Sequence, residues 1–301
     1  MRMSKSKNDT GWGADHWSGL LLSQGWCVIP NAVSPQSIGA LDADLADDFE
    51  HTPFCKGGFY GPRTKRFGRL LVRSPVARDI VQHSLILEIA RRVLEPWCDT
   101  IQLNLTQALA LYPGAPPQLP HRDQDMWRGA IGETEYLVNV MWPFTPYTSA
   151  NGATVVWPDS HGRRALDGDE PRGEFAVELE PGSALMFLGS TLHGGGGNSS
   201  DEVRRGAIVS YCLGWLKPYE NQWLAYPPQI ARQFSRELAA LVGYCQHRPN
   251  LGNYEGQCPS VLLEPDLPQR LAATDSLRPD QEELLASFLR RQCWPERRAL
   301  A

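Results

Sequence analysis

Three residues with metal-binding side chains follow turn-rich or apolar stretches of this 301-residue sequence. His121 and Asp123 are two positions apart, just after the Pro- and Gly-rich run 113–117. Residues i and i+2 of an extended segment point to the same face, so this imidazole and this carboxylate can reach one metal ion. His193, which directly precedes four glycines, is the candidate third ligand. Two histidines and one carboxylate that leave open coordination positions suit non-haem Fe(II) and oxygen chemistry.

Simpler interpretations exist for these residues. A His-x-Asp pair alone is common by chance, and such a histidine is often a hydrogen-bonded turn residue. The glycine run 194–197 could cradle a phosphate, but no Gly-Lys-Ser/Thr follows it, which excludes a P-loop. Further residues are therefore needed to support a metal site.

Arg204 lies 11 positions after His193, at the start of a predicted strand. Its same-face neighbours are mostly small, which leaves room for a bound molecule: Gly206, Ile208, Ser210, Cys212 and Gly214. A guanidinium offers a planar fork for a carboxylate, as a dicarboxylate co-substrate would require. A surface salt bridge is the alternative for Arg204 and the expectation for Arg205.

Strands separated by turns are predicted to position these residues. Apolar and other residues alternate over 101–111, and further strand candidates cover 136–142, 153–157, 175–180, 183–188 and 204–215. Helical patterns cover 15–24, 34–49, 75–94, 228–242 and 280–293. The Gly-rich, aromatic and basic segment 51–73 is expected to be irregular and to form a pocket edge. We predict a mainly β fold with flanking helices, as a sandwich or barrel.

The predicted organisation is one domain over 1–301. It comprises an N-terminal helical and pocket-edge region (1–98), a β core (99–216) and a C-terminal helical region (217–301).

Composition and charge exclude several classes of protein. The formal net charge of −5 argues against a nucleic-acid-binding protein. The seven cysteines lack CxxC spacing, which excludes a zinc ribbon and indicates a reducing compartment. The polar first ten residues show no signal peptide, and no apolar run approaches the ~20 residues that span a membrane. We therefore expect a cytoplasmic protein without membrane association.

The ordered motifs resemble the phytanoyl-CoA dioxygenase (PhyH) family of Fe(II)/2-oxoglutarate-dependent oxygenases. That family shows a His-x-Asp, a distal histidine and an arginine about 11 residues later, as in His121, Asp123, His193 and Arg204 here. The segments 151–154 (Asn-Gly-Ala-Thr) and 158–161 (Pro-Asp-Ser-His) are similar to further family motifs, with an aspartate in place of the usual glycine at 159. The similarity extends over about 17–263, and the tail beyond 265 lies outside it.

The resemblance implies a double-stranded β-helix core, also called a jelly-roll or cupin-like core. It implies that His121, Asp123 and His193 are the catalytic Fe(II) ligands and that Arg204, Thr154 and Gln118 hold 2-oxoglutarate. His161 is expected to be structural. The implied reaction consumes O2, releases succinate and CO2, and hydroxylates a C–H bond of a small hydrophobic metabolite. The carboxylate of Asp123 favours oxygenation over halogenation.

Aromatic and basic residues near the expected pocket entrance are candidate substrate contacts: Phe59, Tyr60, Lys65, Arg66 and Trp127. Packing of helices onto the core is the alternative for the aromatic ones. The sequence leaves open the prime substrate and the carbon oxidised. It also leaves open whether desaturation or cyclisation takes the place of hydroxylation, and whether the protein is a monomer or a homodimer. A zinc-type hydrolase or isomerase using the same triad, and a non-catalytic barrel that binds a small ligand, are the competing functions.

Overall fold

A six-stranded antiparallel sheet forms the centre of the computed structural model, which describes residues 11–127, 129, 132–165 and 173–292. Its order is β1-β7-β4-β9-β3-β2, and a second sheet has the order β6-β5-β8. The larger sheet contains β1 (Trp26–Ile29), β2 (Thr64–Phe67), β3 (Ile101–Leu111), β4 (Leu137–Pro143), β7 (Ala184–Leu188) and β9 (Arg204–Leu213). The smaller one contains β5 (Thr154–Val156), β6 (Phe175–Ala176) and β8 (His193–Gly195).

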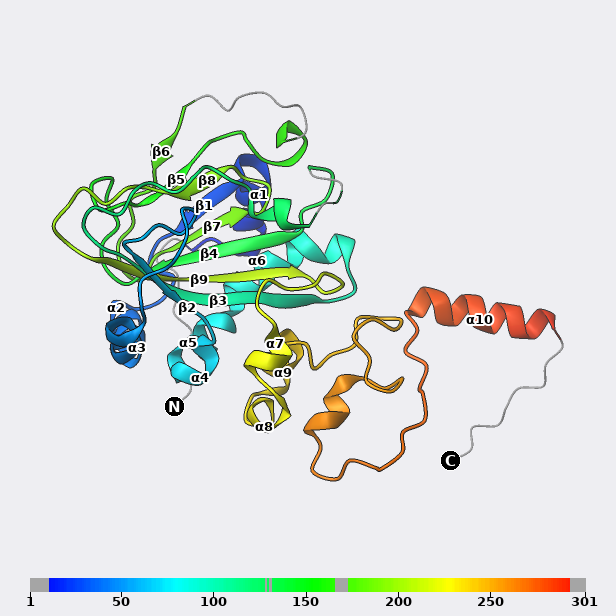
Figure 1. Cartoon of the computed structure of the whole chain (residues 1–301). Coiled ribbons are helices and arrows are strands. Elements are labelled where there is room, and N and C mark those ends of the chain that lie inside the picture. Colours follow the sequence, from blue (N-terminus) through cyan, green and yellow to red (C-terminus); the bar gives the residue numbers. More distant parts are fainter. Residues whose placement is uncertain (1–10, 128, 130–131, 166–172, 293–301) are drawn as a thin grey trace.

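Helices cover one face of the larger sheet, and the smaller sheet lies over the other face (Figure 1). The N-terminal helices are α1 (Ala14–Gln24), α2 (Pro35–Asp44), α3 (Ala46–His51), α4 (Leu70–Arg73), α5 (Pro75–Val81) and α6 (Ser84–Leu94). The C-terminal ones are α7 (Gln222–Ala225), α8 (Pro228–Ala231), α9 (Arg236–Leu241) and α10 (Pro279–Arg291). Short 3-10 turns are η1 (Glu95–Trp97), η2 (Asp123–Met126), η3 (Gly162–Ala165) and η4 (Pro259–Leu263). None of the helices within the described residues combines the length and apolarity needed to cross a membrane.

Strand β4 contributes side chains to both hydrophobic cores of the protein. All seven of its residues are buried. Val138 and Val140 pack into the core under the helices, whereas Met141 packs between the two sheets. Because side chains alternate along a strand, Asn139 shares the inter-sheet side with Met141. A lone polar residue therefore faces the space that holds the candidate site.

The prediction of a mainly β core with flanking helices is confirmed, but several boundaries were wrong. The segment 51–73 contains β2, which pairs with β3, and α4. The predicted helix 34–49 breaks at Leu45, and the helix 75–94 breaks near His83, whose ring bonds the Ala32 carbonyl and caps α6. The helix 228–242 consists of two short helices, and the strand predicted at 175–180 is limited to β6. Tertiary contacts override local periodicity at each of these places.

Candidate metal centre

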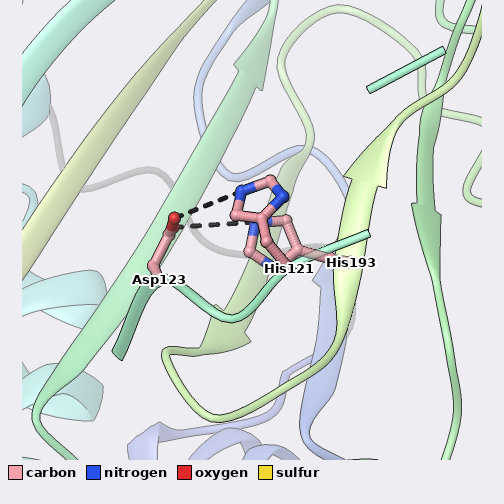
Figure 2. Close-up of side chains that lie close together, drawn as sticks. All are labelled: His121, Asp123 and His193. Atoms are coloured by element: carbon pink, nitrogen blue, oxygen red, sulfur yellow. Dashed lines mark ion pairs between the residues drawn. The ribbon is translucent and has the colours of Figure 1, made fainter. Parts of the chain in front are cut away.

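His121, Asp123 and His193 meet in the space between the two sheets, with their polar atoms turned toward one another (Figure 2). The Asp123 Oδ1 atom is 3.4 Å from Nε2 of His121, and its Oδ2 atom is 3.6 Å from Nε2 of His193. One ligand atom from each residue lies within 4.8 Å of the others. Three donors this close, two imidazole nitrogens and one carboxylate oxygen, form one side of a metal site and leave the other side open.

Backbone pairing fixes the two histidines. The amide of His121 donates to the His193 carbonyl at 2.9 Å, and the reverse bond measures 3.0 Å. The Nδ1 atoms lie 2.8 Å from the Leu119 carbonyl and 3.0 Å from the Thr191 carbonyl, respectively. A carbonyl can only accept, so each Nδ1 carries the hydrogen and each Nε2 keeps its lone pair for a metal ion.

The residues on either side of Asp123 anchor the turn that carries two of the candidate ligands. The Arg122 side chain donates to the carbonyls of Ser190 at 2.9 Å and Ser160 at 3.1 Å. Gln124 is fully buried and bonds the backbone of Thr134 and Tyr136. The two residues that flank Asp123 thus hold η2 in place.

Asn139 positions the Asp123 carboxylate, and the sequence analysis missed it. Its Nδ2 donates to Asp123 Oδ2 at 2.9 Å, and its side chain is 1% exposed. Burial raises the pKa of the Asp123 carboxyl, but the imidazoles of His193 and His121 and this amide outweigh burial and lower the pKa to about 2. Burial lowers the pKa of His193, whereas for His121 burial is outweighed by the hydrogen bond and charge of Asp123, which raise the pKa. The ionised carboxylate and a neutral His193 are in the protonation state that binds a metal, and a protonated His121 would release its proton on binding.

A cavity of about 450 Å³ opens beside the three ligands. Arg204, Thr154 and Gln118 all line it, as the resemblance implied. Gln118 is fastened to β8, since its Oε1 accepts from the Gly195 amide at 3.2 Å. The cavity therefore joins the metal ligands to the three residues predicted to hold 2-oxoglutarate.

Arg204 is 3% exposed and is held from two sides. Its Nη1 donates to the Gly152 carbonyl, and its guanidinium carbon lies 4.3 Å from the centre of the Tyr147 ring. Gly152 has a φ of 90°, which favours glycine, and a Cβ there would lie 2.6 Å from the Gly196 carbonyl oxygen. The Nε of Arg204 is buried without a hydrogen-bond partner among the described residues. A bound carboxylate would satisfy this donor.

A second arginine, Arg66, lines the same cavity from β2. Its Nη1 donates to Gln107 Oε1 at 3.1 Å, whereas its Nε has no partner in the described part of the chain. The Tyr60 ring packs on it at 5.0 Å, and the Tyr60 hydroxyl bonds that of Tyr219. Two cations with unused donors fit a dianionic co-substrate beside a metal ion.

Phe59 and Tyr60 also line the cavity, and the Phe59 ring packs against His121 at 4.9 Å. Further lining residues were missed because nothing in their spacing marks them: Asn104, Gln107, Met126, Met141, Phe187 and Tyr219.

Lys65 and Trp127, which were also predicted to contact substrate, are not among the residues that line the cavity. Lys65 points to the opposite side of β2 from Arg66 and donates to the carbonyls of Phe49 at 2.8 Å and Glu50 at 2.9 Å. Trp127 donates from its indole to the Lys217 carbonyl at 2.9 Å. Their role in the structure is to fasten loops.

Two further residues contact groups outside the cavity. The His161 ring lies 3.0 Å from the Leu22 carbonyl, and Arg205 forms a salt bridge of 2.7 Å with Asp42. Both contacts agree with the structural roles expected for them. Asp159 has a φ of 59°, the left-handed region that glycine favours and that aspartate tolerates.

Comparison with known proteins relates this site to a family of oxygenases. A family model of phytanoyl-CoA dioxygenase (PhyH) matches residues 21–206. The dioxygenase FrzG of Cladobotryum sp is 30% identical over 218 residues, which cover 67% of this chain and 71% of that protein.

Two solved structures from nogalamycin biosynthesis resemble the chain in fold. The non-heme alpha ketoglutarate dependent epimerase SnoN gives a TM-score of 0.55 at 17% identity, over 68% of this chain and 86% of that one. The carbocyclase SnoK gives 0.55 at 20% identity, over 67% and 87%. The predicted double-stranded β-helix core is thereby confirmed.

Proposed function

The chain belongs to the phytanoyl-CoA dioxygenase family and is an Fe(II)/2-oxoglutarate-dependent dioxygenase, and we propose that it hydroxylates a C–H bond of a small, largely apolar metabolite. O2 would be consumed, and 2-oxoglutarate would leave as succinate and CO2. The observation that carries this proposal is the His121–Asp123–His193 cluster, with His193 buried and the other two partly buried, opening into a cavity with Arg204. When bound, Fe(II) together with 2-oxoglutarate supplies the oxidising chemistry, for which the protein provides position and a shielded site.

In this proposal His121, Asp123 and His193 hold Fe(II), and each does so in a state prepared by its neighbours. The imidazoles present Nε2 because carbonyls occupy their Nδ1 hydrogens. The carboxylate cancels one of the two positive charges of the ion, and Asn139 binds its Oδ2 atom. Asn139 would thereby hold the carboxylate in the orientation in which it binds the ion.

Arg204 is proposed to bind the distal carboxylate of 2-oxoglutarate. Its guanidinium is immobilised by Gly152 and Tyr147, so little conformational freedom is lost on binding. Thr154 and Gln118 would add hydrogen bonds from β5 and from the segment before His121. Arg66 would offer a second charge to the co-substrate or to an anionic group of the prime substrate.

The rest of the cavity suits an apolar molecule with few polar groups. Phe59, Tyr60 and Met126 lie on its lining together with Met141 and Phe187. The names of the two structural neighbours add epimerisation and ring closure as further outcomes of the same oxidation, which product analysis would separate from hydroxylation.

The test is anaerobic addition of Fe(II) and then 2-oxoglutarate to the purified protein. A weak visible charge-transfer band is expected only when both are present, followed by succinate formation when O2 is admitted. Arg204→Ala should abolish the band at co-substrate concentrations that saturate the parent protein. Arg205→Ala is the matched control, because Arg205 pairs with Asp42 outside the cavity. Turnover without O2 and 2-oxoglutarate would instead establish the metal-dependent hydrolase or isomerase.

A further inference from the structure

Helix α10 carries an apolar face that belongs to neither hydrophobic core of the described residues. Four large apolar side chains lie one helical turn apart in pairs and are 38–66% exposed: Leu284, Leu285, Phe288 and Leu289. None of the residues of α10 is buried. Figure 1 shows the helix projecting away from the two sheets and from the helices that cover them.

The segment before α10 is fastened to the rest of the protein. The Thr274 amide donates to the Gly256 carbonyl at 3.0 Å, and Gln257 donates to the Thr274 hydroxyl at 2.8 Å. The helix start is capped, because the Arg278 amide donates to Gln281 Oε1 at 3.1 Å. The apolar face is therefore presented from an anchored base.

A free helix of this length needs a partner. Isolated helices shorter than ~12–15 residues are marginal in water, and helices in proteins gain most of their stability from packing of an apolar face. The 13 residues of α10 obtain no such packing within the described chain. The partner must then offer an apolar surface of similar length.

The sequence of α10 is complementary to its own reverse. From 281 to 292 it reads Gln-Glu-Glu-Leu-Leu-Ala-Ser-Phe-Leu-Arg-Arg-Gln. When two copies are related by a two-fold axis between 286 and 287, Gln281 of one copy faces Gln292 of the other. The acidic residues 282–283 then face the basic residues 290–291, and apolar positions face apolar positions. A second copy of α10 running in the opposite direction meets these requirements, because a two-fold interface pairs residue i with j and j with i.

We propose that the protein forms a two-fold symmetric homodimer in which the apolar faces of two α10 helices pack antiparallel. The acidic first turn of each helix (Asp280, Glu282 and Glu283) then lies alongside the basic last turn (Arg290 and Arg291) of the other. Parallel packing would instead place like charges side by side. The antiparallel arrangement also aligns the helix dipoles favourably.

Charge disfavours a membrane surface as the occupant of this face. The five charged residues of α10 comprise three acidic and two basic side chains. Helices that lie on anionic membranes are rich in Lys and Arg on their polar face. The net negative charge of α10 therefore fits a second copy better than a lipid surface.

The test is sedimentation velocity of the full chain across about 1 µM to about 1 mM, the range expected of a small interface. A reversible monomer–dimer equilibrium is expected, and Phe288→Asp should weaken it at least about tenfold. Arg290→Glu/Arg291→Glu should also be monomeric alone, but should form a heterodimer with Asp280→Lys/Glu282→Lys/Glu283→Lys. Added salt should weaken the parent dimer, because antiparallel packing pairs opposite charges.

Several results would overturn the proposal. They are a monomer at every concentration, a dimer indifferent to Phe288→Asp, or a dimer that salt strengthens. A melting temperature of Phe288→Asp several degrees below that of the parent protein, compared at a concentration at which both are monomers, would show that α10 packs on its own chain instead. Co-sedimentation of the monomer with phosphatidylserine vesicles would assign the face to a membrane.

Discussion

The Asp123 carboxylate is prepared by hydrogen bonds from outside the ligand set. Arg122 and Gln124 fix the turn on either side of it, and Asn139 reaches it from the facing strand. Such partners orient metal ligands and commonly change metal affinity when they are replaced. Three neighbours thus make one flexible side chain a ligand of defined orientation.

Replacement of Asn139 by leucine should weaken metal binding by about 10–100-fold, because the amide that orients the carboxylate is lost. Leucine has a similar volume and adds no unpaired polar group, so the fold should persist. Calorimetric titration with Mn(II) gives the affinity, and the circular dichroism spectrum serves as the control. An affinity equal to that of the parent protein would remove Asn139 from the proposed site.

Asp123→Ala should eliminate measurable metal binding and turnover, since only two neutral imidazoles remain. Metal content after reconstitution with Fe(II) and removal of excess metal is the measurement. Retention of stoichiometric iron with full succinate formation would refute the ligand assignment.

Arg204→Ala should raise the KM for 2-oxoglutarate about 30- to 150-fold, the equivalent of ~2–3 kcal/mol for a hydrogen-bonded charge pair. Arg204→Lys should recover only part of this, because an ammonium lacks the planar fork. Metal affinity should stay unchanged in both variants. If the KM does not rise, another cation, with Arg66 the first candidate, holds that carboxylate.

The sequence allowed the proposed metal ligands to be selected but not the residues that orient them. His121, Asp123, His193 and Arg204 belong to spaced motifs, and the structure brings them to one cavity. Asn139 belongs to no motif, and its role depends on which strand faces η2. Its one available sign was its isolation as a polar residue in the apolar run 137–141.

At the scale of elements, β2 was the main error of the sequence interpretation. Glycines and basic residues around 51–73 suggested irregular chain, yet Lys65 pairs with Ala110 and Arg66 with Leu109 in register. Pairing with β3 is a long-range contact that no local pattern of the segment reveals. The strand separates two neighbouring cations, placing Arg66 in the cavity and Lys65 at the carbonyls of the last turn of α3.

This separation predicts opposite consequences for two adjacent substitutions. Lys65→Met should lower the free energy of unfolding by about 3 kcal/mol, because two carbonyls lose a charged donor, while the KM values stay unchanged. Arg66→Met should change the KM for co-substrate or substrate with a smaller loss of stability. Urea unfolding and steady-state kinetics measure the two effects. A changed KM in Lys65→Met with parental stability would return Lys65 to the list of substrate contacts.

On the scale of the whole molecule, the metal ligands come from segments far apart in the chain. His121 pairs with His193 of β8 in the smaller sheet, whereas Asp123 of η2 is held by Asn139 of β4 in the larger sheet. The site therefore exists only when the two sheets are assembled, and its ligands should stabilise the entire fold. Helix α10 lies apart from this assembly and should not contribute to it.

Thermal unfolding should therefore show that the metal binds first and 2-oxoglutarate second. Mn(II) at 100 times its Kd should stabilise the protein by about 2.7 kcal/mol, which corresponds to roughly 4 °C for a chain of this size. 2-Oxoglutarate should raise the melting temperature further only when the metal is present, because the metal completes its binding site. EDTA should reverse both shifts, Asp123→Ala should lack both, and Arg204→Ala should lack mainly the second. Phe288→Asp should retain both, since α10 is remote from the site. A shift by 2-oxoglutarate without metal would mean that the arginines alone form the co-substrate site.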